Sequence, residues 1–171
     1  MKAADTRIEE LRREFDQAFA LPPAELAARP VNILAIRLAG NPYGLRLAEL
    51  SGLQLRRKIV PLPGRGGEFL GIAGVRGKAV PVYGLARLLG LTEDTEQDRW
   101  LAIRGVEEPV AVAFAEFTAH HTVDPSELRP AEGAGAQGAI PEVVVLGGVP
   151  HPVIRLATVL EKIQGAASGG V

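Results

Sequence analysis

Residues 69–91 read FLGIAGVRGKAVPVYGLARLLGL, and this stretch decides the fold. Its two apolar arms are Phe69–Ala73 and Ala79–Tyr83. Between them we expect a hairpin turn near Arg76-Gly77, because glycine accepts the positive φ that tight turns need. Leucines at helical spacing follow and predict one helical turn that ends at Gly90. The stretch therefore predicts a β-hairpin closed by a short leucine-rich helix.

The same pattern recurs on both sides of this stretch. We expect strands at Val31–Leu38, Tyr43–Leu47, Trp100–Ile103, Val110–Phe114, Phe117–Val123, Val143–Leu146 and Val149–Ile154, and a final helix at Leu156–Ile163. The chain has 20 Gly and 13 Pro among 171 residues but only 5% aromatic residues, a composition that favours short strands and small β-barrels. The two halves of the chain thus share a plan of β-hairpins followed by a short helix.

The N-terminal segment has a different pattern. Ile8, Leu11, Phe15, Ala18 and Phe19 recur at three- and four-residue steps, which predicts an amphipathic helix over Thr6–Phe19. We therefore divide the chain into an N-terminal helical extension (1–30), one domain (31–164) made of two intertwined subdomains with approximate halves 31–91 and 92–164, and a flexible tail (165–171).

Composition and charge narrow the classes of function. The chain has no cysteine, which excludes disulfides and thiolate metal sites, and no apolar run approaches the ~20 residues of a membrane span, so we expect a cytoplasmic protein. Residues 45–91 carry a net charge of +6 and residues 92–142 a net charge of −8. Such opposite patches suit docking to a partner, although both stretches also fit simple solvated faces.

The residues that could form a nucleotide, metal or nucleic-acid site lack the neighbouring residues that such sites need. Gly133, Gly135 and Gly138 match a dinucleotide-binding pattern, but no strand precedes them and a proline follows where a helix should open. His120 and His121 are adjacent in a strand and point to opposite faces, so we expect the histidines at the surface or in an interface rather than on a metal. The basic segment lacks the interleaved aromatic residues of nucleic-acid binders. We therefore expect no catalysis, no cofactor, no metal and no nucleic acid.

At residues 69–91 the chain resembles the signature of the CheW-like family of chemotaxis coupling domains. The matching positions are Gly71, Arg76, Gly77, Pro81, Val82, Leu85 and Leu91. The resemblance extends over about residues 31–163, through Tyr43-Gly44, Leu62-Pro63 and Arg129-Pro130. The chain departs from the family's polar positions at Gly52, Gly74, Gly84 and Ala115, while the apolar frame and Arg76 are kept.

The resemblance implies a mostly β fold of two small, roughly five-stranded, SH3-like β-barrels that pack on a shared apolar interface. It implies a non-catalytic adaptor that couples a chemoreceptor tip to the regulatory domain of the histidine kinase CheA, clustered at receptor arrays on the inner face of the membrane without inserting into it. The candidate partner-binding residues are Arg76, Gly77, Val75, Gly71, Leu50 and Leu53. The alternative is a scaffold of the same fold that has lost kinase and receptor coupling and assembles with itself, in rings with homologous domains, or with another partner.

Overall fold

The computed structural model describes residues 29–55, 58–63, 67–92, 100–132 and 138–167, and the side chains of the last helix to residue 163. The elements in chain order are β1 (Val31–Leu38), β2 (Asn41–Arg46), η1 (Leu47–Glu49), β3 (Gly52–Leu55), β4 (Ile59–Val60), β5 (Phe69–Val75), β6 (Lys78–Gly84), α2 (Leu85–Leu88), β7 (Trp100–Arg104), β8 (Val110–Phe114), β9 (Glu116–Val123), η3 (Pro125–Glu127), β10 (Arg129–Pro130), β11 (Glu142–Leu146), β12 (Val149–Ile154) and α3 (Leu156–Ala167). The helix expected at Thr6–Phe19 lies outside the described residues. The final helix extends beyond its expected end at Ile163, into the expected tail.

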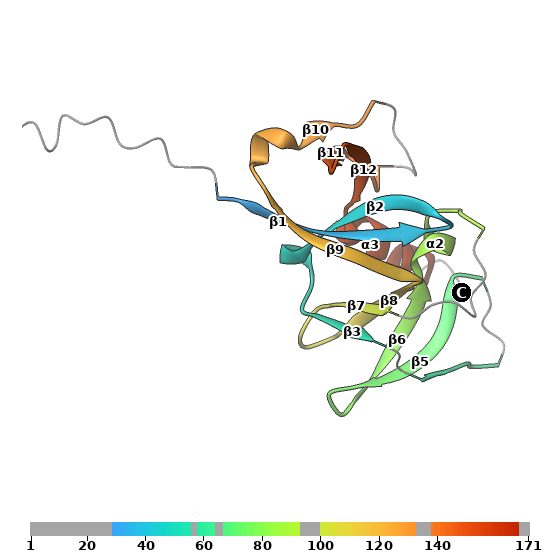
Figure 1. The fold of residues 1–171 in the computed structure, drawn as a ribbon. Helices are drawn as coiled ribbons and strands as arrows, with labels where there is room; N and C mark the ends of the chain where they lie inside the picture. The colour runs from blue at the N-terminus through green and yellow to red at the C-terminus, as the bar shows by residue number, and fades with distance from the viewer. Residues whose placement is uncertain (1–28, 56–57, 64–66, 93–99, 133–137, 168–171) are drawn as a thin grey trace, which may run out of the picture.

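The described strands form two sheets, seen one above the other in Figure 1. Sheet A has the order β10-β11-β12-β2-β1-β9, and sheet B has the order β3-β7-β8-β6-β5-β4. Each sheet has six strands rather than the five expected. Within each sheet two antiparallel hairpins meet along one parallel pair, β12 with β2 and β6 with β8. The expected mostly β architecture of two small subdomains is confirmed.

The two halves of the chain repeat the same order of elements but exchange their first hairpins. Hairpin β1–β2 belongs to the first half, yet it pairs with β12 in sheet A, whereas hairpin β7–β8 of the second half pairs with β6 in sheet B. The edge strand β3 pairs with β7, and the edge strand β9 pairs with β1. The sheets therefore divide the chain differently from the halves 31–91 and 92–164, because each sheet contains strands of both.

Three hairpins turn in the same way. The central residues are Ala39-Gly40 in β1–β2, Arg76-Gly77 in β5–β6 and Gly147-Gly148 in β11–β12, and all six have positive φ. Two consecutive positive φ values are typical of the type I′ turn, whose twist matches that of the flanking strands. The expected turn at Arg76-Gly77 is confirmed.

The core has three parts because the central strands bury both faces. On β8, Ala111 and Ala113 face the interior of sheet B, while Val112 and Phe114 face a core shared by the two sheets. Strand β1 likewise divides its residues between the interior of sheet A and the shared core. Leu156, Val159 and Leu160 of α3 pack into the shared core, so α3 closes the junction between the sheets. The expected shared apolar interface is confirmed.

Candidate partner-binding surface

The β5–β6 turn presents a cation at its tip. Arg76 has a φ of 50° and Gly77 a φ of 78°, and both residues are exposed. The Arg76 guanidinium lies over Gly52 of β3, with Nη2 3.5 Å from the point where a Cβ at Gly52 would stand. Strand β3 is not hydrogen-bonded to β5 or β6 in sheet B, so this contact joins parts of the sheet that are not neighbours in the strand order. Among the described residues, Arg76 has no ion pair or hydrogen bond, and its donors remain free for a partner.

A cavity of about 200 Å³ opens beside this tip, and we call it the tip cavity. Its lining includes Ser51, Val75, Arg76, Ile103, Val106 and Pro109. Val75 is 4% exposed and packs in the interior of sheet B, so it forms apolar wall rather than accessible surface. A charged donor at the rim above an apolar lining suits a carboxylate next to a small apolar side chain.

The other sequence-based candidates have packing roles. Gly71 has a φ of 141°, and a Cβ there would lie 2.2 Å from the carbonyl oxygen of Val60. Glycine is therefore required by the close approach of β4 to β5. Leu50 and Leu53 are half-buried and pack against the shared core. The structure thus brings together Arg76, Gly77 and Val75, whereas Gly71 lies against β4 and Leu50 and Leu53 pack on the shared core.

A second cavity of about 380 Å³ lies between α3 and sheet B, and we call it the α3 groove. Val110, Leu160 and Ile163 are its apolar lining, while Glu108 and Glu161 are exposed beside them. The groove is the open end of the shared core, because Val110, Leu160 and Ile163 also pack there. An apolar groove with polar residues around it suits the apolar ridge of a helix.

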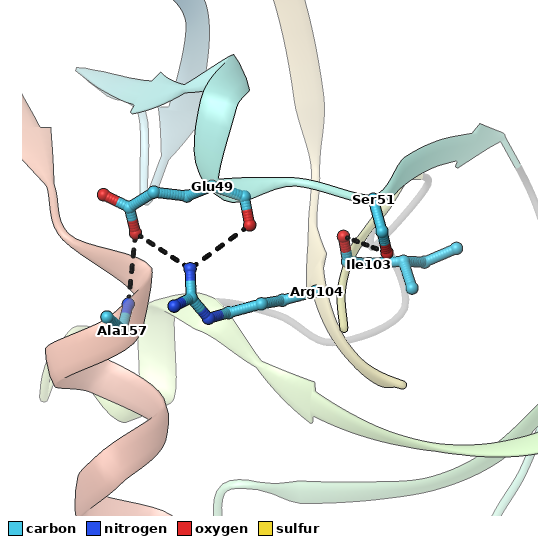
Figure 2. A network of polar contacts seen from close by, with 5 residues as sticks. All are labelled: Glu49, Ser51, Ile103, Arg104 and Ala157. Atoms are coloured by element: carbon cyan, nitrogen blue, oxygen red, sulfur yellow. Dashed lines mark hydrogen bonds and ion pairs between the residues drawn. The ribbon is translucent and has the colours of Figure 1, made fainter. Parts of the chain in front are cut away.

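Glu49 connects α3 and β7 through polar contacts, which Figure 2 shows. Its carboxylate accepts a hydrogen bond from the backbone N–H of Ala157, at 3.1 Å, in the first turn of α3. The same oxygen lies 3.6 Å from Nη1 of Arg104, which also donates to the Glu49 carbonyl oxygen at 3.3 Å. A carboxylate at a helix N-terminus satisfies a free N–H and interacts favourably with the helix dipole. Glu49 therefore links the start of α3 to Arg104 at the end of β7, and both Ala157 and Arg104 line the groove.

The β7–β8 turn lies between the two cavities, although the sequence does not mark it as a candidate binding element. Gly105 lines both, whereas Arg104 faces the α3 groove and Val106 faces the tip cavity. Val106 is 76% exposed, the highest value among the large apolar side chains exposed in the described part of the chain. The pattern of an apolar residue between Gly105 and Pro109 is the signal that could have marked this turn.

The histidines lie on β9 and β12 of sheet A. Within the described residues, no three His, Cys, Asp or Glu side chains group as metal ligands. His120 is exposed and its Nε2 lies 3.1 Å from Oδ1 of Asn32. His151 corrects our expectation of a surface or interface position, because it is 9% exposed, with Nδ1 2.8 Å from the Val149 carbonyl oxygen. Nor does the described part of the chain contain a helix with the length and hydropathy of a membrane span.

Comparison with known families places the chain. The model of the CheW-like domain matches residues 32–164, which run from β1 into α3. The chain belongs to the CheW-like domain family. Among solved structures, the scaffolding protein TtCheW from Thermoanaerobacter tengcongensis is similar, with a TM-score of 0.67 and 18% sequence identity over 77% of this chain and 93% of that one. At that identity the likeness shows a shared fold. No curated protein matches the chain.

The positions where this CheW-like chain lacks the family's polar residues differ in their surroundings. A Cβ at Gly74 would meet nothing within 4 Å, and one at Gly52 would make ordinary contacts with Arg76 and Ile103. Gly84 is buried, and a Cβ there would lie 3.3 Å from the side chain of Arg87. Packing therefore does not require glycine at Gly52 or Gly74.

Proposed function

We propose that this protein is a non-catalytic adaptor of a bacterial chemosensory array, which couples chemoreceptors to the histidine kinase CheA in the cytoplasm. The observation that carries the proposal is the match of the CheW-like domain to nearly the whole described chain, residues 32–164. The similar protein TtCheW is described as a scaffolding protein, which supports the same class of function.

Two surfaces suit this function and lie on either side of β7. The tip cavity offers the free guanidinium of Arg76, which can grip a carboxylate or backbone carbonyls of a partner with its planar fork. The α3 groove offers an apolar floor between α3 and sheet B, which can receive the ridge of a receptor's helical hairpin. We assign partner binding to Arg76 and Gly77, with Val75 as the cavity wall and Gly71, Leu50 and Leu53 as residues that maintain the fold.

A second candidate is a CheW-like scaffold that has lost coupling and assembles with itself or another partner. The observation in its favour is the set of apolar or glycine residues at the family's polar positions, namely Gly52, Gly74, Gly84 and Ala115. Loss of polar side chains from an interface removes charge-assisted hydrogen bonds, which are its stronger contacts.

Binding measurements on the full chain separate the two. Isothermal titration would use a receptor cytoplasmic-tip fragment and the CheA regulatory domain, both from the same genome. The adaptor proposal expects saturable binding to each, with a ternary complex in sedimentation velocity. If the chain binds neither partner and self-associates in their absence, the adaptor function is wrong and the scaffold function takes its place.

A further inference from the structure

The turn between β7 and β8 holds an apolar side chain out into solvent. A single exposed valine is ordinary on a protein surface, and Val145 is also 58% exposed. Val106 differs from Val145 in what surrounds it, because it lines the tip cavity on a turn that several polar groups hold in place, and the preceding Gly105 also lines the α3 groove.

Two residues outside this turn brace it, Ser51 just before β3 and Lys78 at the start of β6. The Ser51 hydroxyl donates to the carbonyl oxygen of Gly105 at 2.7 Å. The Lys78 ammonium donates to the carbonyl oxygens of Val106 and Glu107, each at 3.2 Å. Gly105 has a φ of 86°, and a Cβ there would lie 2.8 Å from the Glu108 carbonyl oxygen. The side chain of Val106 is therefore presented on a preorganised turn, which lowers the entropy lost when a partner binds.

The two cavities adjoin at the β7–β8 turn, so one partner surface can contact both. The tip cavity is about 200 Å³ and the α3 groove about 380 Å³, and both are lined by Gly105. Two packed helices have axes about 8–10 Å apart and leave a furrow between their ridges. An exposed side chain next to two cavities is complementary to such a furrow.

The charges on the two sides differ in sign. The tip-cavity side carries Arg76, which is free of ion pairs among the described residues. The α3-groove side carries Glu108 and Glu161, both exposed, and Arg104, whose charge is paired with Glu49. Opposite charges on the two flanks fix the orientation of a partner, because the reversed orientation brings like charges together.

We propose that Val106 is a docking knob that inserts between two packed helices of a protein partner, with an acidic residue of one helix over Arg76 and a basic residue of the other over Glu108 and Glu161. This inference rests on the proposed adaptor function and adds to it the residue at the centre of the contact and the charge pattern of the partner.

The test compares two exposed valines in the full chain. Val106→Ser is expected to weaken binding to the helical receptor-tip fragment by about tenfold or more, since the valine would be fully buried in the complex. Val145→Ser, on the β11–β12 hairpin, is the matched control and is expected to leave the affinity within about twofold. Ser51→Ala keeps Val106 but removes a brace, and we expect a loss of about three- to tenfold.

The outcomes distinguish this inference from the proposed function. If the wild-type chain binds neither the receptor tip nor the CheA regulatory domain, the adaptor function fails and the inference fails with it. If the wild type binds the receptor tip and Val106→Ser binds equally well, the knob is wrong while the adaptor function stands. A similar loss for Val145→Ser would also overturn it. Thermal melting of each variant shows whether a loss of binding reflects unfolding.

Discussion

The guanidinium of Arg76 lies directly over Gly52, with Nη2 3.5 Å from the point where a side chain at that position would begin. The contact joins the β5–β6 turn to β3 across the open end of sheet B. Gly52 offers no oxygen to the guanidinium, so Arg76 is held near the tip cavity without an internal counter-charge among the described residues. The residue at position 52 therefore determines whether the Arg76 guanidinium is free to bind a partner.

Placing a carboxylate at Gly52 should occupy Arg76. A Cβ at this position makes only ordinary contacts, so Gly52→Asp is expected to fold, and its carboxylate would lie within reach of the guanidinium. An exposed ion pair contributes about 0–1 kcal/mol, so the melting temperature should change little. Binding of the receptor tip or the CheA regulatory domain should weaken about three- to tenfold in titration. Gly52→Asn, which has the same shape without the charge, is the control, and equal affinities for both variants would contradict this prediction.

Removing the cation gives the complementary result. Arg76→Ala is expected to leave the melting temperature nearly unchanged, because the residue is exposed at a turn, and to weaken partner binding by about 1.5–3 kcal/mol. Arg76→Lys should restore little, since an ammonium lacks the planar fork. The measurement is titration calorimetry alongside thermal melting.

The turn itself provides a control for Arg76. Its φ of 50° lies in the left-handed region, which asparagine tolerates well, so Arg76→Asn keeps the turn and removes the charge. Unchanged affinity for both Arg76→Ala and Arg76→Asn would show that Arg76 makes no partner contact. A large loss of stability would show instead that it braces the two strands.

The sequence predicts local structure well where a residue type strongly favours one conformation. The turn at Arg76-Gly77 follows from a glycine between alternating strands, and α2 follows from leucine spacing up to Gly90. The exchange of hairpins between the two sheets is not visible in the sequence, because strand pattern sets which faces are buried but not which strands pair.

Contacts between segments that are far apart in the sequence could not be predicted from it either. Glu49 and Ala157 are 108 residues apart, and nothing local marks that glutamate as a helix cap. Gly71 matched the family signature and was therefore assigned to partner binding, whereas its surroundings show a close approach of backbone. Val106 was missed because its importance depends on cavities that form only when three segments meet.

The contact between Glu49 and α3 should be important for stability. Its side chain is 16% exposed and its carboxylate serves both the Ala157 N–H and Arg104. Loss of a helix cap costs about 1 kcal/mol and loss of a partly buried charge partner adds to it, so Glu49→Ala should lower the free energy of unfolding by about 1–2 kcal/mol. Urea denaturation measures this directly.

An exposed ion pair in the same chain serves as the control. Glu116 lies 3.9 Å from Arg37 with its side chain 58% exposed, so Glu116→Ala should cost under about 0.5 kcal/mol. If Glu49→Ala and Glu116→Ala are equally mild, Glu49 does not fix α3 to β7. We also expect Glu49→Ala to weaken binding in the α3 groove, since the helix would lose its anchor.

The turn after β9 gives a pH-dependent prediction. Asp124 Oδ1 accepts from the Ser126 hydroxyl at 2.6 Å and from the Ser126 N–H at 2.9 Å, and these hydrogen bonds hold the pKa of Asp124 below its ordinary value. A lowered pKa in the folded state means that this carboxylate contributes stability above the unfolded pKa. The contribution is lost as the pH falls below about 4 and through the lowered pKa.

Removing the Ser126 hydroxyl should reverse part of the lowering of the Asp124 pKa. In Ser126→Ala the hydrogen bond from the side chain is lost, so the pKa of Asp124 should rise toward its ordinary value while the backbone bond keeps it somewhat lowered. Carboxyl chemical shifts followed by NMR titration measure the change at Asp124 alone. Identical titration curves for wild type and Ser126→Ala would show that the hydroxyl does not stabilise the carboxylate.

Gly71 allows a direct choice between a partner contact and a packing constraint. In Gly71→Ala the added Cβ would lie 2.2 Å from the Val60 carbonyl oxygen and 2.9 Å from Cα of Pro61, and the φ of 141° is strained for any side chain. Backbone of β4 would have to move, and its pairing of Val60 with Ile72 would weaken. We expect a loss of about 2–4 kcal/mol in the free energy of unfolding.

Gly74→Ala makes the same substitution on the same strand where a Cβ meets nothing within 4 Å, so it should change stability by at most about 0.5 kcal/mol. Urea denaturation of both variants, followed by partner titration at a temperature where each is folded, separates the two roles. Normal stability with lost binding in Gly71→Ala would make Gly71 a partner contact. Reduced stability with normal affinity in the folded fraction would mean that the signature glycine is kept for the approach of β4 to β5, and that partner recognition in this region rests on Arg76.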